Sequence, residues 1–152
     1  MTAHAAPFPW RTYLWAVLAV SIWVNASEVA RYFLLVMPAM RDSLAVVPDI
    51  APMNLPVFLI WGLWDTVLVC LCVLTWWMWA ERFGPTLSSA IWAGTMSFAF
   101  LFGLFWLAMW NMNLATPGLL AMALPWAWVE MVVASLIARR IYSSLGSTRA
   151  NG

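Results

Sequence analysis

Three carboxylates lie within hydrophobic segments of this chain, where a bilayer would favour leucine. They are Glu28, Asp65 and Glu130. A charged side chain at membrane depth is costly unless it is paired or hydrated, so an acid inside the membrane is by default a candidate functional group. Arg31 follows Glu28 by one helical turn and is the cation at similar depth. Because one arginine cannot neutralise three acids, proton or ligand chemistry has to be considered.

The first acid belongs to a polar stripe whose members are spaced i, i+4, i+7 and i+11, so that they fall on one face of a helix. They are Ser21, Asn25, Glu28 and Tyr32. Such a face must meet protein or water rather than lipid. In this interpretation Asn25 positions a polar group or a water molecule, and Arg31 orients Glu28 or receives an anionic head group.

Five tryptophans accompany the acids: Trp23, Trp61, Trp64, Trp126 and Trp128. Trp61 and Trp126 each precede an acid by four residues and should share its helix face. Tryptophan rings stabilise positive charge by cation–π attraction. We therefore predict the three acids as catalytic groups, and the five tryptophans with Asn25 and Arg31 as ligand-binding groups. The likeness of residues 61–65 to residues 126–130 also leaves open a duplicated hairpin.

The composition places the chain in a membrane. Of its 152 residues, 65% are hydrophobic and 9% charged, which is far outside the range of soluble domains. There is no basic cluster beyond Arg139 and Arg140, so nucleic-acid binding has no support. The one histidine, His4, precedes the hydrophobic segments, and the only cysteines are Cys70 and Cys72. The sequence therefore predicts no metal site and no cofactor.

Four hydrophobic runs are long enough to cross a bilayer, which predicts an all-α integral membrane four-helix bundle in one domain, residues 1–152. The predicted spans are residues 12–37, 56–80, 86–110 and 117–142. Residues 38–55 form an outer loop, and the polar tail 143–152 is expected to be disordered. A signal peptide cleaved after Ala26 is a weaker alternative, since hydrophobic sequence resumes at Val29.

Local patterns add detail to this scheme. In the outer loop, Met40, Leu44 and Val47 would lie on one side of a short interfacial helix that covers the bundle. In the third span, small residues four apart predict close helix packing. These pairs are Ala90–Gly94, Ala93–Ser97 and Ala99–Gly103. In the fourth span, Pro125 should kink the helix and free the carbonyl of Ala121 beside Glu130.

The arginines predict the orientation. Five lie in the N-terminal tail, the second loop and the C-terminal end, namely Arg11, Arg82, Arg139, Arg140 and Arg149, whereas the first loop has only Arg41. By the positive-inside rule both termini face the cytoplasm, and we expect a multi-pass protein of a bacterial-type inner or plasma membrane. With a rise of about 1.5 Å per residue, the three acids can then share one layer between the outer leaflet and the midplane.

Three functional classes use buried acids of this kind. The first is a site that binds or transforms a hydrophobic or cationic small molecule, lipid- or isoprenoid-like, with an acid as proton donor. The second is an accessory or assembly subunit whose polar face meets a membrane-protein partner. The third is a proton- or cation-coupled transporter, which with four spans implies a homo-oligomer. Whether the protein is an enzyme stays open.

A purely structural role is the remaining alternative. In it Glu28 pairs with Arg31, Asp65 accepts a hydrogen bond from Asn25 or Ser27, and Glu130 is protonated because burial disfavours its charged form. Polar contacts of this kind hold membrane helices together at about 1 kcal/mol each.

The predicted membrane topology can be tested independently of the function. Reporter fusions at Arg82 should show cytoplasmic activity, and fusions in the loop at residues 38–55 should show activity on the opposite side, because arginine-rich loops are retained in the cytoplasm. A reporter at Arg82 that is active outside would contradict the predicted orientation.

Overall fold

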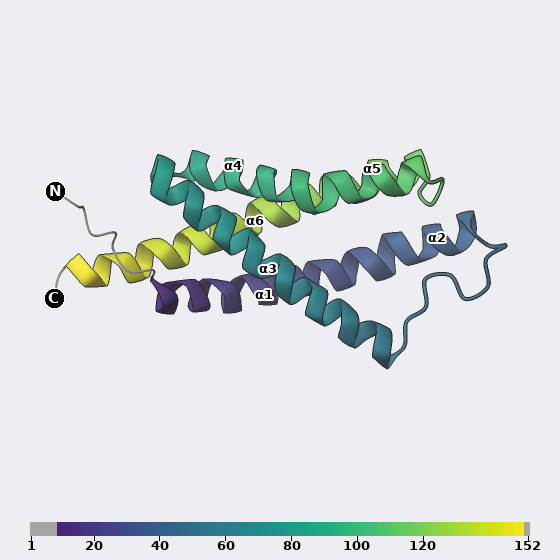
Figure 1. The fold of residues 1–152 in the computed structure, drawn as a ribbon, viewed down its shortest axis with the longest axis horizontal. Helices are drawn as coiled ribbons and strands as arrows, with labels where there is room; N and C mark the ends of the chain where they lie inside the picture. Colours follow the sequence, from purple (N-terminus) through teal and green to yellow (C-terminus); the bar gives the residue numbers. More distant parts are fainter. Residues whose placement is uncertain (1–8, 151–152) are drawn as a thin grey trace.

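The computed structural model describes residues 9–150, with side chains as far as residue 145. All regular elements in this part of the chain are helices (Figure 1). They are α1 (Trp10–Arg31), η1 (Tyr32–Val36), α2 (Met37–Ser43), α3 (Leu55–Phe83), α4 (Leu87–Phe98), η2 (Ala99–Gly103), α5 (Leu104–Asn111) and α6 (Pro117–Ala150). The elements η1 and η2 are turns of π-helix. His4 lies outside the described residues.

Within residues 9–150, consecutive helices join into four units long and apolar enough to span a membrane: Trp10–Ser43, Leu55–Phe83, Leu87–Asn111 and Pro117–Leu145. The prediction of an all-α chain is thereby confirmed, and the four apolar helices support a multi-pass membrane protein. Helix α6 continues to Ala150, so the tail expected to be disordered is helical to that point, and residues 151–152 lie outside the description.

Three helices begin at a polar cap that the sequence supplies. The backbone N–H of Val57 donates to Asn54 Oδ1 (3.1 Å), that of Ser89 to Thr86 Oγ1 (3.1 Å) and that of Leu119 to Thr116 Oγ1 (3.2 Å). Each bond satisfies an N–H group that the first turn of a helix leaves without a partner. Helix α3 ends at Gly84, whose φ of 82° suits glycine. Helices α3 and α4 therefore form the expected antiparallel hairpin.

The first span passes through Pro38 instead of ending before it. In an α-helix, Pro38 would clash with the carbonyl of Leu34 and could not donate to it. The preceding turn is π-helical, and the N–H of Met37 donates to the carbonyl of Tyr32, so the wider turn accommodates the proline. As a result α2 continues the first span, and the separate interfacial helix predicted for this region is wrong.

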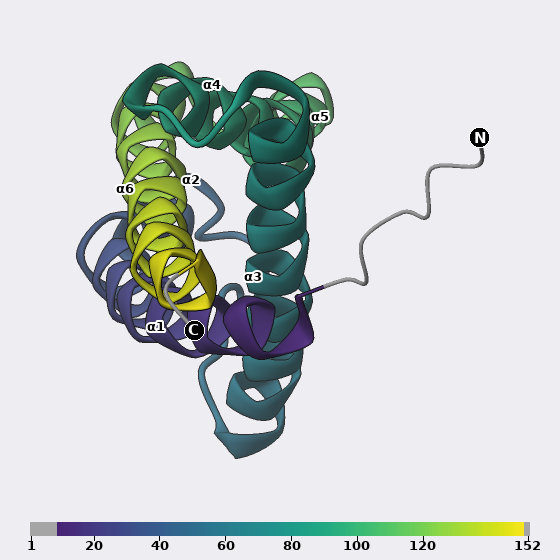
Figure 2. The ribbon, with the colours of Figure 1, turned by 90° about the vertical axis from the view of Figure 1, so that its left-hand side faces the viewer.

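The spans pack most closely where their buried residues are small. Figure 2 shows α6 between α1 and α4, and these are the two helices it contacts most extensively. A Cβ atom at Gly94 of α4 would lie 2.6 Å from Val132 Cα and 2.7 Å from Met131 O of α6. Gly94 thus allows direct backbone contact between the helices. The pair Ala99–Gly103 instead forms η2 and is not buried, so it does not serve this contact.

Helix α3 is tightly packed only towards one end of the bundle. We call this the α3–α4 end, because it holds the turn at Gly84; the opposite end, with the turn between α5 and α6, is the α5–α6 end. Figure 1 shows α3 running obliquely, so that its first residues diverge from the other spans. Among the described residues of α3, Asp65 is the first buried one, and neither η1 nor α2 has a buried residue. Asp65 therefore marks the point where close packing begins.

The contact at Gly94 can be tested with a matched glycine. We expect Gly94→Ala to destabilise the protein by about 1–3 kcal/mol, because the methyl group would force α4 and α6 apart. Gly62→Ala is the control, since a Cβ atom there meets nothing within 4 Å. Unfolding of the purified protein in detergent provides the measurement. Equal stability of the two variants would contradict the close α4–α6 contact.

Candidate functional site

The buried stripe of α1 is displaced by one residue from the predicted one. Its members are Ala16, Val20, Val24, Ser27 and Arg31. Asn25 is exposed, and its Nδ2 donates to the carbonyl of Ser21 on its own helix (2.8 Å). The hydrogen bonds of α1 to the other spans are made by Tyr13, Trp23 and Ser27, and Asn25 does not join them.

Arg31 is a buried cation with an incomplete set of partners. Its Nη2 donates to Glu28 Oε1 in an ion pair on the same helix, and it is only 3% exposed. The guanidinium carbon lies 4.6 Å from the centre of the Phe102 ring in η2, a cation–π contact. Within the described part of the chain, Nε and Nη1 have no hydrogen-bond partner. Much of the donor capacity of this guanidinium is thus unused.

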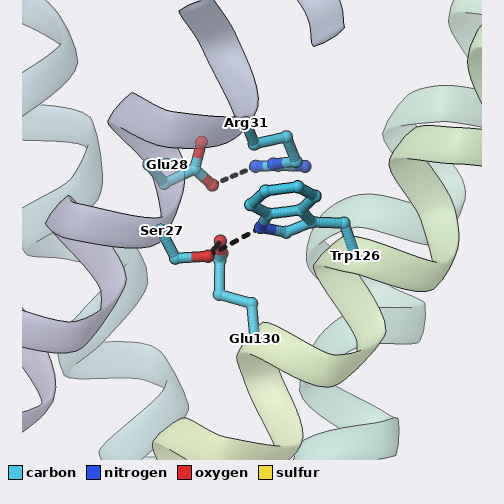
Figure 3. A network of polar contacts seen from close by, with 5 residues as sticks. All are labelled: Ser27, Glu28, Arg31, Trp126 and Glu130. Carbon is cyan, nitrogen blue, oxygen red and sulfur yellow. Dashed lines mark hydrogen bonds and ion pairs between the residues drawn. The ribbon is translucent and has the colours of Figure 1, made fainter. Parts of the chain in front are cut away.

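Glu130 of α6 is fully buried and bound to α1. The hydroxyl of Ser27 donates to Glu130 Oε2, and the indole N–H of Trp126 donates to Ser27 Oγ (2.9 Å) (Figure 3). The indole N–H of Trp23 donates to the Glu130 carbonyl (3.0 Å). These bonds link α1 and α6 at one level. Glu130 Oε1, by contrast, has no hydrogen-bond partner among the described residues.

Asp65 of α3 completes the group. It is 6% exposed, and its Oδ1 lacks a hydrogen-bond partner within residues 9–145. Glu28 and Arg31 lie near enough to act electrostatically on both Asp65 and Glu130. The structure therefore brings together the three predicted acids from three spans around Arg31. We call Ser27, Glu28, Arg31, Asp65, Trp126 and Glu130 the central cluster.

The charge of the central cluster does not balance. Three ionised carboxylates and one guanidinium sum to two net negative charges (−3 + 1 = −2). A buried charge without compensation costs several kcal/mol even after relaxation. The cluster can lower that cost by binding protons, by admitting water to the unpartnered oxygens of Asp65 and Glu130, or by binding a cation.

The five predicted tryptophans are divided by the structure. Trp23 and Trp126 are partly buried and contribute the hydrogen bonds described above. Trp61, Trp64 and Trp128 are 41%, 59% and 40% exposed, and the Trp61 ring lies beside Tyr32, with ring centres 6.4 Å apart. Trp128 donates to Thr95 Oγ1 (3.1 Å). An aromatic cage of all five rings is therefore not assembled around the acids.

The sequence reasoning named Ser27 only as a possible donor to Asp65, whereas in the structure Ser27 donates to Glu130. It missed Phe102, which no motif marks. The position of the carbonyl freed by Pro125 also differs from the expectation. Pro125 and Ala121 both lie on the exposed face of α6, so the carbonyl freed by the proline is on the side away from Glu130.

The role of Ser27 can be measured with a serine control. We expect Ser27→Ala to lower stability by about 1–3 kcal/mol, because it leaves Glu130 Oε2 without its donor and Trp126 without its acceptor. Ser43→Ala should be nearly neutral, since that exposed hydroxyl donates only to Ala39 O on its own helix (2.8 Å). Unfolding in detergent would compare them, and a neutral Ser27→Ala would argue against the α1–α6 link.

The chemistry of the central cluster has to be inferred from its own geometry. Comparison of the chain with protein families, with curated proteins and with solved structures finds no match. The functional argument below therefore uses the burial, contacts and charges of the residues described above.

Proposed function

We propose that this chain is a proton-handling membrane protein of the proton-coupled transport class, in which the central cluster binds and releases protons. The observation that carries the proposal is the grouping of three acids, of which Asp65 and Glu130 are buried and Glu28 is half-buried, around one buried arginine. Glu28 is the counter-ion of Arg31 through its direct ion pair. Asp65 and Glu130 are then the groups that exchange protons.

The unpartnered atoms support this division of roles. Asp65 Oδ1 and Glu130 Oε1 are buried and have no hydrogen-bond partner among the described residues. A protonated carboxyl carries a donor, which a neighbouring acceptor or a water molecule can use. A proton also removes one of the two surplus negative charges without requiring a large cavity. Arginine keeps its proton under all ordinary conditions, so the exchanging groups must be the acids.

A site for a hydrophobic or cationic small molecule, expected first from the sequence, has weaker support. Arg31 itself occupies the face of Phe102, and the N–H groups of Trp23 and Trp126 are engaged within the bundle. The other three tryptophans are exposed and contribute no hydrogen bond to the central cluster. A lipid- or isoprenoid-like ligand would therefore lack the aromatic surroundings that favour positive charge.

The proposal includes a setting. We place both termini on the cytoplasmic side of a bacterial-type inner or plasma membrane, as the arginines indicate. Because four spans leave much apolar surface outside the bundle, a solute pathway would be completed by a homo-oligomer. A role as an accessory subunit makes a different prediction, since it depends on helix contacts and not on the titration of any acid.

Infrared spectroscopy of the protein in lipid tests the proposal. We expect a carboxylic-acid carbonyl band whose intensity changes reversibly with pH, reduced in Glu130→Gln and in Asp65→Asn because each replacement removes one proton-binding group. Asp42→Asn is the control, as Asp42 is exposed at the end of α2. Wild-type protein without such a band would contradict proton binding by the cluster.

A second comparison separates the accessory-subunit alternative. If Glu130→Gln and Asp65→Asn keep the physiological activity while Gly94→Leu abolishes it, the protein acts through helix contacts and the proposal fails. Loss of activity in well-folded Glu130→Gln and Asp65→Asn proteins, with Asp42→Asn unaffected, would support the proposal.

A further inference from the structure

A row of small polar side chains continues from Glu130 towards the α3–α4 end. Cys72 of α3 and Ser135 of α6 are completely buried, and Ser97 of α4 is 2% exposed. Cys72 Sγ lies 3.9 Å from Ser135 Oγ, and either group can donate. Ser97 and Glu130 both lie close enough to Cys72 to act on its thiol. Three helices thus contribute polar groups to the interior one to two turns from Glu130.

The next turn holds a small cavity. Trp76 follows Cys72 by four residues and is 1% exposed, and its indole N–H has no hydrogen-bond partner within the described residues. It lines a cavity of about 10 Å³ together with Tyr13, Ala138 and Tyr142, which is near the volume needed for one water molecule. A water molecule there would accept a hydrogen bond from the N–H of Trp76.

The row reaches the surface beside this cavity. The rings of Trp76 and Tyr142 are nearly perpendicular (88°), with their centres 6.5 Å apart. The Tyr142 hydroxyl donates to Glu81 Oε1 (2.9 Å), and Glu81 is exposed near the end of α3. From Glu130 to Tyr142 the rise along α6 is about 18 Å, which is more than half of a hydrocarbon core of about 30 Å.

We propose that these groups form a proton route from Glu130 to the α3–α4 end, through Ser97, Cys72 and Ser135, the water site at Trp76, and Tyr142 with Glu81. The route rests on the proposed proton-handling function and adds to it the side of the membrane with which Glu130 exchanges. In each step a hydroxyl, thiol or water accepts a proton on one side and releases one on the other. The intermediates are therefore unchanged after transfer, and one proton moves between Glu130 and the aqueous phase.

Two observations distinguish this row from ordinary packing. First, the hydroxyl of Ser97 and the indole N–H of Trp76 are buried without a hydrogen-bond partner in the part of the chain described, and such groups are rare unless water reaches them. Second, the position is asymmetric. In residues 9–145, the buried polar side chains outside the central cluster are Ser89, Ser97 and Ser135; Ser89 and Ser135 lie on the α3–α4 side, and Ser97 lies near the level of Glu130, since Gly94 of the same helix packs against Met131 and Val132.

The charged and titratable groups along the route come from three spans. At the cluster, α1 contributes Glu28 and Arg31, α3 contributes Asp65 and Cys72, and α6 contributes Glu130; α4 contributes the neutral Ser97. At the surface the groups are Tyr13 of α1, Glu81 of α3 and Tyr142 of α6. Kinetics of proton uptake must therefore be assigned with single variants and not from pH dependence alone.

Time-resolved infrared measurement of Glu130 protonation after a pH jump tests the route in lipid vesicles. We expect Cys72→Val and Ser135→Ala to slow the appearance of the carboxyl band by about tenfold, the effect of losing one hydrogen-bonded link of roughly 1–1.5 kcal/mol. Cys72→Ser is the matched control and should keep the wild-type rate, because it retains a donor and acceptor at the same place. Glu130→Gln assigns the band.

The outcomes separate the two proposals. A titrating band that is lost in Glu130→Gln, with wild-type rates in folded Cys72→Val and Ser135→Ala proteins, would overturn the route and leave the proton-binding function standing. Slow uptake in Cys72→Val and in Cys72→Ser alike would also overturn it, because the hydroxyl would then fail to replace the thiol. A wild-type protein without any titrating band would overturn the function itself. Should Cys72→Val not fold, Ser97→Ala replaces it with the same expected slowing.

Discussion

The buried charge of Arg31 is the constraint on which the rest of the interior depends. A guanidinium cannot lower the free-energy cost of burying its charge by losing its proton. The fold must therefore supply compensating groups at that depth. Glu28 does so from the same helix, and Phe102 covers the guanidinium with a ring face. The acids of α3 and α6 lie within reach of the same charge. The charge of Arg31 therefore favours packing of three spans against one another at the same level.

The π-helical turns lie on either side of this cation. Element η1 begins at the residue after Arg31, and η2 contains Phe102. Turns of this type are rare and frequently occur at functional sites. Pro38 gives a local cause for η1, whereas η2 has no proline. In η2 the wider turn accompanies the one buried aromatic ring of the segment, which is the ring that covers Arg31.

Sequence reasoning succeeded where a feature depends on composition and failed where it depends on helix rotation. Span number follows from hydropathy, and the cap at Thr116 and the turn at Gly84 follow from their residue types. The inner face of α1 could not be found in the same way. In a membrane the lipid-facing side is as apolar as the core, so Val20 and Val24 could have faced either way. The polar spacing from Ser21 to Tyr32 therefore selected a face one residue away from the buried one.

The depth of the acids was easier to anticipate than their surroundings. Counting residues along straight helices suffices to place Glu28, Asp65 and Glu130 at a common level, because the rise per residue hardly varies. The tryptophans could not be placed by the same count. Trp61 shares a helix face with Asp65, but α3 diverges from the bundle before that turn, and only the packed structure reveals this divergence.

Packing also makes the two exchanging acids different from one another. Glu130 is on the helix that contacts both α1 and α4 closely, with Gly94 and a stripe of buried alanines limiting its movement. Asp65 is on the helix that leaves the bundle one turn earlier, so a small change in the tilt of α3 would alter its surroundings first. In the proposed function, Glu130 would exchange protons through the fixed row towards the α3–α4 end. Asp65 would exchange them with the α5–α6 end, and the positive charge of Arg31 would favour proton loss from each acid most when its carboxylate is closest.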